Sequence, residues 1–423
     1  MADRDGPLSA ERDLAAPAGA TAPTGPREEP PLRCAVVTST TPDLVPALDG
    51  LCERLEQALD GARPDLLVAF YTPHHSAEVP ALGERLLRRL DPVVLMGCPA
   101  AGVIGEQVEI ESQAGLTLWA ASWPGAELVP FHLEAHKQGE DGPPQLSGWP
   151  EGLSADPDDG PGFVLLADPY STPADELLTQ FHTRYPGAPV VGGVASGSSG
   201  PGEALLLSRD GVQDGGVLGL AVGGAVRLDP VVSQGCRPVG RHFVVTRAER
   251  NVIRGLGGQP ALAQLRQVIE LAEGRDRELM QHALHVGRVV DERQSRFETG
   301  DFLVRNVLGI DPASEAIAIG DFVRAGQTIQ FMVRDPRSAA GELRTLLDRR
   351  ASGGGALGSL LFSCNGRGQR FFGEPHSDVG NVLGGTGDAP VGGFFCAGEI
   401  GPVGGQPFLH GYTASVAVFR RRG

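Results

Sequence analysis

The chain has 423 residues, of which 60 are glycine and 34 are proline, while 41% are hydrophobic and only 5% aromatic. This apolar share is enough for a core built mostly from valine, leucine and alanine, which excludes a wholly disordered or collagen-like chain. The formal net charge of −16 would repel phosphate backbones and anionic lipids, so we expect no nucleic acid and no membrane as a partner.

Residues 1–32 are rich in alanine, proline and glycine and lack the basic and apolar regions of a secretory signal. We therefore expect a disordered lead-in to a cytoplasmic protein. The six cysteines include no Cys-x-x-Cys pair. The sequence accordingly predicts no disulfide framework, no metal site and no cofactor.

The first regular elements are expected between residues 65 and 121. The pattern predicts a buried strand over 65–71 and an amphipathic helix over 77–90, whose leucines recur every fourth position. A strand over 92–98 then enters a glycine-rich turn, and 115–121 supplies a further strand.

The same order of elements is expected twice more along the chain. The second copy comprises, in order, a strand, a helix and two strands, at 163–167, 172–185, 189–193 and 216–222. The third copy comprises a strand, a short helix and two strands, at 357–363, 379–383, 390–396 and 413–419. We interpret the three copies as a shared architecture, which need not mean a shared active site.

Each copy has two glycines, with four residues between them, where its second strand meets the turn: Gly97 and Gly102, Gly192 and Gly197, and Gly393 and Gly398. Such glycines allow a ligand to approach the backbone closely, or they only make a tight turn possible. The sequence leaves both interpretations open.

The block between the second and third copies has a different pattern. It predicts a strand and turn at 231–240 and then five further strands, at 243–246, 285–290, 302–308, 315–319 and 328–333. It also predicts two helices, at 260–272 and 338–349, and polar connections at 275–281 and 291–299. We therefore expect an α/β to α+β fold. Its two modules of mixed β-sheets, with helices on their outer faces, are expected to span residues 33–250 and 251–423.

Nucleophilic, titratable and hydrogen-bonding side chains are most concentrated in the third copy, where several follow a strand or a glycine. The ends of strands are where sheets of this class usually bind ligands. The candidate ligand-binding residues there are Cys364, Asn365, Arg367, Gly398, Glu399, His410 and Tyr412.

Cys364 has two interpretations. As an enzyme residue it would be a nucleophile, with His376 or His410 as its base. As a structural residue it would be a small buried hydrophobic group, as free cysteines usually are. For Arg367 and Glu399 the alternatives are contact with a ligand or a structural salt bridge.

Two further sets combine a guanidinium with an amide, which together suit a carboxylate. One set lies around Arg237, and the other is Arg305 with Asn306. The alternative is that these arginines cap strand ends or pair with nearby acids. His74 and His75 predict no metal site, because adjacent side chains on an extended backbone point apart.

Several segments in order resemble the FIST (F-box and intracellular signal transduction) family. They are SQGCRPVG at 233–240, FLVRNVLGID at 302–311, SCNGRG at 363–368, GEIGPVG at 398–404 and LHGYT at 409–413. GCPAAG at 97–102 is similar to the turn of the family's N-terminal module, with Pro99 where serine is more usual. The resemblance covers an N-terminal and a C-terminal module, from about residue 33 to the end.

The resemblance implies a sensory or ligand-binding module, for which amino acids are the ligands proposed in the family. Bacterial members are often joined to kinase, cyclase or methyl-accepting output domains, and eukaryotic relatives carry an F-box. Neither attachment is recognised here. The chain is therefore expected to act through a separate signalling output protein or by an activity of its own.

The sequence is therefore compatible with three functions. The first is a cytoplasmic sensor of an amino acid or small carboxylate, and it is the one we favour. The second is a cysteine-dependent acyl-transfer or hydrolytic enzyme that uses Cys364. The third is a protein-interaction adaptor, as the eukaryotic relatives suggest.

Overall fold

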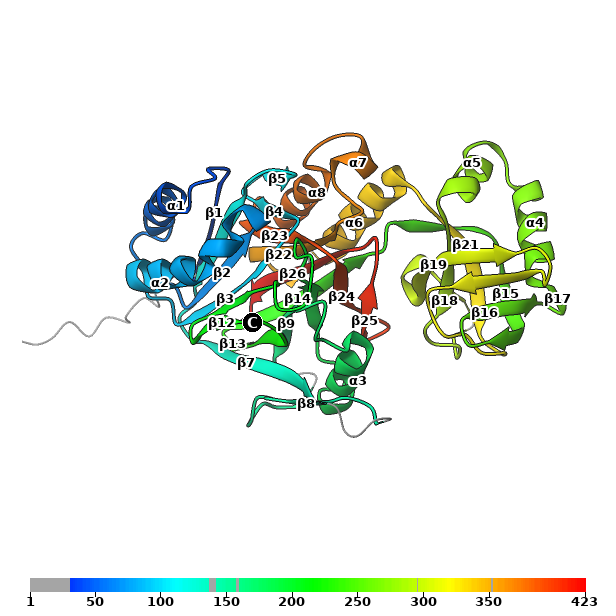
Figure 1. Cartoon of the computed structure of the whole chain (residues 1–423), viewed down its shortest axis with the longest axis horizontal. Helices are drawn as coiled ribbons and strands as arrows, with labels where there is room; N and C mark the ends of the chain where they lie inside the picture. The colour runs from blue at the N-terminus through cyan, green and yellow to red at the C-terminus, as the bar shows by residue number, and fades with distance from the viewer. Residues whose placement is uncertain (1–30, 137–141, 157–159, 295, 351–352) are drawn as a thin grey trace, which may run out of the picture. The chain divides into compact units, whose positions relative to one another are not determined.

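The computed structural model describes residues 31–136, 142–156, 160–294, 296–350 and 353–423. Except for its last two residues, the predicted disordered lead-in lies outside the described residues. The described chain forms four β-sheets accompanied by helices (Figure 1), which confirms the mixed α/β prediction.

The first sheet carries its helices on one face. Its spatial strand order is β1 (Arg33–Ser39), β6 (Leu116–Ser122), β2 (Leu66–Tyr71), β3 (Val94–Pro99), β11 (Leu206–Ser208) and β12 (Gly211–Gln213). Strand β2 pairs in parallel with β3 and antiparallel with β6. The covering helices are α1 (Leu44–Ala58) and, after η1 (Pro73–Glu78), α2 (Val79–Leu90), whose buried leucines pack against this sheet.

The second sheet has the same central pairings, with β9 parallel to β10 and antiparallel to β13. Its order is β25 (Gln406–His410), β24 (Gly398–Val403), β10 (Val190–Val194), β9 (Gly162–Ala167), β13 (Val217–Gly224), β7 (Ala126–His136) and β8 (Gln145–Ser147). Helix α3 (Ala174–Arg184) packs on it through Leu177, Leu178 and Phe181.

The third sheet again has a central strand, β22, that is parallel to one neighbour and antiparallel to the other. Its order is β14 (Val226–Ser233), β26 (Ala414–Arg421), β22 (Ala356–Cys364), β23 (Val391–Cys396), β4 (Gly102–Gly105) and β5 (Val108–Glu111). Helices α6 (Pro336–Arg350) and α8 (Ser377–Thr386) cover one face, and the short α7 (Gln369–Phe372) precedes α8.

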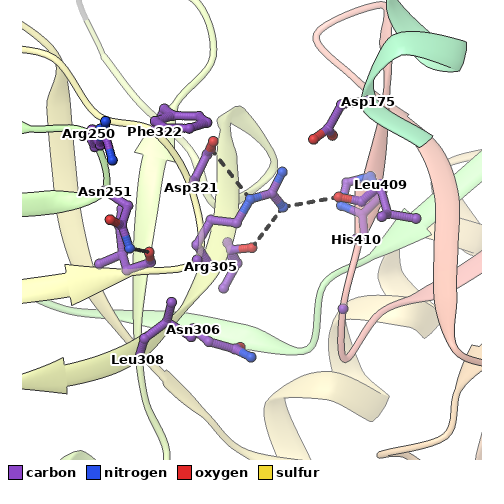
Figure 2. A pocket seen from close by; sticks show the side chains of 14 residues that line it. Asp175, Arg250, Asn251, Arg305, Asn306, Leu308, Asp321, Phe322, Leu409 and His410 are labelled. Atoms are coloured by element: carbon purple, nitrogen blue, oxygen red, sulfur yellow. Dashed lines mark hydrogen bonds and ion pairs between the residues drawn. The ribbon is translucent and has the colours of Figure 1, made fainter. Parts of the chain in front are cut away.

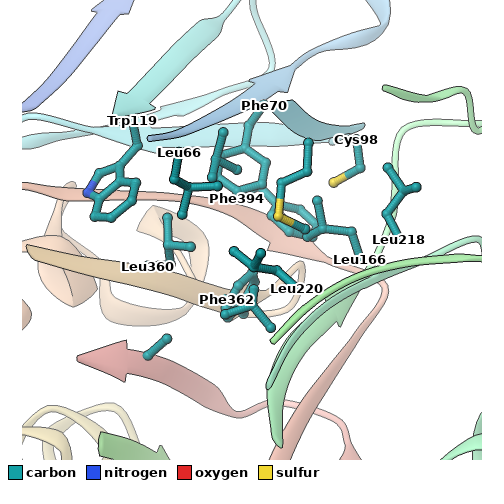
Figure 3. Close-up of a cluster of buried hydrophobic side chains, with 14 of the residues drawn as sticks. Leu66, Phe70, Cys98, Trp119, Leu166, Leu218, Leu220, Leu360, Phe362 and Phe394 are labelled. Atoms are coloured by element: carbon teal, nitrogen blue, oxygen red, sulfur yellow. The ribbon is translucent and has the colours of Figure 1, made fainter. Parts of the chain in front are cut away.

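A hairpin from elsewhere in the chain completes each of these sheets. Hairpin β4–β5 follows β3 in sequence but pairs with β23, β11–β12 follows β10 but pairs with β3, and β24–β25 follows β23 but pairs with β10. The sheets meet in a shared core (Figure 3), where the ring centroid of Phe394 lies 4.9 Å from that of Phe70 and 5.7 Å from that of Phe362.

The fourth sheet closes into a barrel. Its order is β15 (Cys236–Glu249), β21 (Thr328–Arg334), β18 (Leu284–Val289), β19 (Phe302–Asp311), β20 (Ala316–Ile319), β16 (Val252–Leu256) and β17 (Gln259–Pro260), and β15 also pairs with β16. Helix α4 (Ala261–Leu271) packs on it, and α5 (Gly274–His282) and η2 (Thr299–Asp301) lie in its connections.

Two expectations bear on this barrel. The polar connection predicted at 275–281 was wrong, because the segment forms most of α5; Met280 is its one buried residue, so no apolar stripe marked it as a helix. The module boundary at residues 250 and 251 stays a prediction. It falls in the turn between β15 and β16, two paired strands of the barrel.

Candidate functional site

Arg305 and Asn306 line a cavity of about 620 Å³ at the side of the barrel. The barrel contributes residues from the β15–β16 turn, from β19 and from the segment after β20, and the opposite wall comes from α3 and β25. Figure 2 shows Arg305 between Asp321 on the barrel side and Leu409 with His410 on the opposite side. Of the other sequence-predicted residues, His410 also lines this cavity.

Arg305 is held at the centre by contacts to both walls. Its Nε lies 3.4 Å from Oδ2 of Asp321, and its Nη1 donates to the carbonyl oxygen of Leu409 at 3.1 Å (Figure 2). Burial lowers the pKa of Arg305, an effect that the nearby Asp321 carboxylate opposes. A guanidinium stays charged in proteins, so the cavity contains a partly desolvated cation.

A second cavity of about 290 Å³ adjoins the first. Both are bordered by Asp175, Arg305, Asp321 and Leu409, and the second adds Arg288. Arg288 also binds Asp321, with Nη2 and Oδ2 3.0 Å apart, so that two guanidiniums share one carboxylate. The charged residues lining the two cavities are three arginines and two aspartates. In a chain of net charge −16, this is a local excess of positive charge.

His410 contributes a neutral imidazole to the cavity wall. Burial lowers its pKa to about 4. Its Nε2 lies 2.9 Å from the carbonyl oxygen of Gly401 and must therefore be the donor, which leaves Nδ1 as the acceptor. That Nδ1 is buried and has no hydrogen-bond partner among the described residues.

The other main candidates from the third copy lie apart from this cavity, in a buried polar cluster at the end of β22. Arg367 forms a bidentate ion pair with Asp378, Nε to Oδ2 at 2.7 Å and Nη2 to Oδ1 at 2.8 Å, and both side chains are fully buried. Ser363 donates a further hydrogen bond to Asp378 at 2.8 Å. Arg367 thus has the structural salt bridge that the sequence left open, and its partner is Asp378.

Glu399 lies in the same cluster as a fully buried carboxyl group. Its Oε2 accepts a hydrogen bond from the Thr413 amide at 3.1 Å, whereas Oε1 has no hydrogen-bond partner among the described residues. Burial raises the pKa of Glu399 to about 8, so the group is mostly protonated at neutral pH. A neutral carboxyl group can remain in this position without a cation paired to it.

Cys364 is buried beside this carboxyl group, and burial, with a smaller effect from Glu399, raises its pKa to about 11. The candidate bases are engaged elsewhere. His376 accepts a hydrogen bond from the Glu109 amide at 2.9 Å through Nδ1, and His410 binds Gly401. The arrangement therefore holds a protonated thiol whose side-chain partner is the mostly protonated carboxyl group of Glu399, and the nucleophile role stays a prediction.

The state of Cys364 can be tested by alkylation. The thiolate is the reacting form, so we expect iodoacetamide to label Cys364 slowly in the folded protein at pH 7 and faster as the pH rises toward its pKa of about 11. Peptide mass spectrometry after short pulses at several pH values measures this. The urea-unfolded protein is the control, because its thiols titrate near the usual value of ~8.5. Fast labelling at pH 7 in the folded state would contradict the expectation and favour the enzyme hypothesis.

Tyr412 packs against Arg334, a residue of this cluster that the sequence did not indicate. Its ring lies 4.3 Å from the guanidinium of Arg334, and the ring of Phe371 lies 3.7 Å from the same group. Arg334 also donates to the carbonyl oxygen of Gly366. A single arginine at the end of a strand carries no motif, so no sequence signal pointed to it.

The remaining candidates lie outside both cavities. Arg237 forms ion pairs with Asp276 and Asp335. This is the second of the two interpretations that the sequence left open for it. Asn365 is exposed, and Gly398 pairs with Val194 at the start of β24. The candidates therefore do not form a single cleft.

Among the described residues, no helix is long and apolar enough to cross a membrane, and no group of metal-binding side chains is found. Residues 65–259 match the FIST N domain and residues 261–402 match the FIST C domain. The chain belongs to the FIST family. This confirms the resemblance, and FIST domains are sensory domains of signal transduction.

Relatives of this FIST protein occur in mycobacteria. The uncharacterized protein Rv0628c of Mycobacterium tuberculosis is 38% identical over 390 residues, which is 92% of this chain and 100% of the relative. The uncharacterized protein Mb0898c of Mycobacterium bovis is also 38% identical over 390 residues, 92% of this chain and 99% of the relative.

Proposed function

We propose that this FIST protein is a cytoplasmic sensor that binds an amino acid or another small carboxylate in the cavity around Arg305, and that it signals through a separate output protein. The observation that carries the proposal is a half-buried guanidinium bordering two cavities, in surroundings with more arginines than aspartates. Burial strengthens the attraction between such a cation and an anion, because water screens it less.

The cavity offers partners for each group of such a ligand. The carboxylate would bind Arg305, whose planar guanidinium suits bidentate contact. The exposed carboxylate of Asp175 faces the same cavity (Figure 2) and suits an ammonium group. The amides of Asn251 and Asn306 remain available for polar atoms of a ligand beyond its carboxylate and ammonium groups.

Binding there would also give a means of signalling. Arg305 belongs to the barrel, whereas Leu409, whose carbonyl oxygen it binds, belongs to β25 of the second sheet. A ligand that draws the guanidinium away from Leu409 would change the contact between these parts. A change of affinity for an output protein would follow from such a difference between the two states.

A thermal-shift screen with the amino acids and small organic acids tests the proposal. A ligand at 100 times its dissociation constant should stabilise the protein by ~2.7 kcal/mol. The variant Arg305→Met should weaken binding by ~10- to 100-fold, because a hydrogen bond to a charged group contributes ~1.5–3 kcal/mol.

The matched control is Arg254→Met. Arg254 forms an exposed ion pair with Glu249 on the same barrel and lines neither cavity. The Arg254→Met variant should bind the ligand like the wild type. If no compound shifts the wild type, or if both variants respond like it, the proposed function is wrong.

A further inference from the structure

The cavity around Arg305 is large for a free amino acid. Its volume of about 620 Å³ is roughly four times the ~150 Å³ that encloses a benzene-sized molecule. Ligand pockets of ~300–1,000 Å³ bind molecules of drug size. One amino acid bound through its carboxylate to Arg305 would leave much of this space to water.

Two asparagine amides line the same cavity. Asn306 is exposed, and its side chain has no hydrogen-bond partner within the described part of the chain. Asn251 donates through Nδ2 to the carbonyl oxygen of Ile319 at 3.1 Å, and its Oδ1 has no such partner there. A primary amide offers both a donor and an acceptor, which is what a peptide bond requires of its partner.

Large apolar side chains lie exposed beside these amides. Leu308 is 62% exposed and Phe322 is 71% exposed, and both line the cavity. Figure 2 shows Phe322 close to Asp321 and Leu308 close to Asn306. Exposed apolar residues grouped beside a cavity are a feature of ligand-binding grooves. They provide contacts for the side chains of a ligand.

We infer that the ligand of this cavity is a short peptide with a free C-terminal carboxylate, an inference that rests on the proposed function. The carboxylate binds Arg305, the amides of Asn251 and Asn306 bind the last peptide bonds, and Leu308 and Phe322 contact apolar side chains. Capture of a C-terminal carboxylate with specificity from neighbouring pockets is a known way to recognise peptides.

Two sources share this chemistry, a free di- or tripeptide and the C-terminal tail of a protein. Asp175 distinguishes them, because its exposed carboxylate lies on the wall opposite the barrel. A free peptide can place its ammonium there, whereas a protein tail has none. Acetylation of the peptide's N-terminus therefore separates the two sources.

The test compares leucine, the tripeptide Leu-Ala-Leu, its C-terminal amide and its N-acetyl form by titration calorimetry. The tripeptide should bind at least ~10-fold more tightly than leucine, which corresponds to ~1.4 kcal/mol. The amide should bind ~10- to 100-fold more weakly than the tripeptide, because the charged contact to Arg305 is lost. Weak binding of the N-acetyl form would identify free peptides as the source, and unchanged binding would identify protein tails.

Asn306→Ala is the informative variant, since its side chain has no internal bond to lose and folding should be unaffected. It should weaken tripeptide binding by ~2- to 10-fold, the value of one or two neutral hydrogen bonds, and leave leucine binding unchanged. Gln107→Ala, at an exposed amide side chain outside both cavities, is the control and should bind all compounds like the wild type.

The results separate the two proposals. If leucine binds and the tripeptide binds no more tightly, or if its amide binds equally well, the peptide inference is overturned while the proposed function stands. If Asn306→Ala weakens leucine and tripeptide alike, the amide has no role in reading the peptide bond, which also overturns the inference. If none of the compounds binds and the amino-acid screen is also negative, both proposals fall.

Discussion

Replacing Arg367 by methionine is expected to lower the free energy of unfolding by ~3–5 kcal/mol, the usual cost of removing one partner of a buried ion pair. The remaining carboxylate of Asp378 would be fully buried, with Ser363 as its one other side-chain donor among the residues that the structure describes. Arg367 also lowers the pKa of the nearby Glu399, so its loss would raise that pKa further and keep the carboxyl group protonated at pH 7.

The matched control is Arg89→Met. Arg89 binds Glu56 through the same two-bond geometry, at 2.7 and 3.1 Å, but the two side chains are 46% and 39% exposed. Exposed ion pairs contribute ~0–1 kcal/mol because water competes for both charges. Because both variants remove an ion pair of the same geometry, the difference between their free energies of unfolding measures the effect of burial.

Urea unfolding at pH 7, followed by circular dichroism, gives both values. Should Arg367→Met fail to fold, Ser363→Ala is the milder variant, expected to cost ~1 kcal/mol through the lost hydrogen bond to Asp378. A stability of Arg367→Met within ~1 kcal/mol of the wild type, equal to that of the exposed control, would refute the structural role assigned to the pair.

Local patterns predicted the three central strands of each of the first three sheets, because their signals lie within the segment itself, whereas strand β1, helix α1 and the hairpins were not predicted. Strand β2 is a continuous apolar run, and the leucines of α2 fall on one helical face. The partners of the hairpins could not be predicted in this way. Hairpin β4–β5 pairs with β23, far along the chain, and nothing in the sequence of the hairpin specifies that neighbour.

The candidate site was predictable to a similar extent. Arg305 and Asn306 stood out as an adjacent guanidinium and amide, and both line the cavity. The residues that complete it, Asp175, Asp321 and Leu409, come from other elements and carry no motif of their own. Distances between such segments depend on the packing of whole sheets. The sequence therefore could not show that Arg305 lies apart from Cys364 and Arg367.

The first glycine of each predicted pair lies within β3, β10 or β23, and the structure supplies a reason for it. A Cβ atom on Gly97, Gly192 or Gly393 would collide with a backbone carbonyl oxygen of the parallel neighbour strand, that of Ala69, Leu165 or Leu361 respectively. All three lie on the strand parallel to the central one of their sheet. These glycines allow close strand contact, which accounts for them without a ligand.

Replacing Gly393 by alanine should therefore destabilise the protein strongly. Backbone cannot yield as a flexible side chain does, and we expect a loss on the order of 3 kcal/mol, the upper end of overpacking costs. The control is Gly380→Ala in α8, where an added Cβ meets no atom within 4 Å. Alanine in a helix is better than glycine by ~0.5–1 kcal/mol, so this variant should gain stability.

Thermal and urea unfolding measure the change in stability of each variant. We expect opposite signs for the same replacement of glycine by alanine. Opposite signs would show that the contact with Leu361, and not glycine's flexibility, makes position 393 sensitive. If Gly393→Ala were as stable as the wild type, strands β22 and β23 could separate without cost. The close approach would then not explain the glycine, and a role in approaching a ligand would regain support.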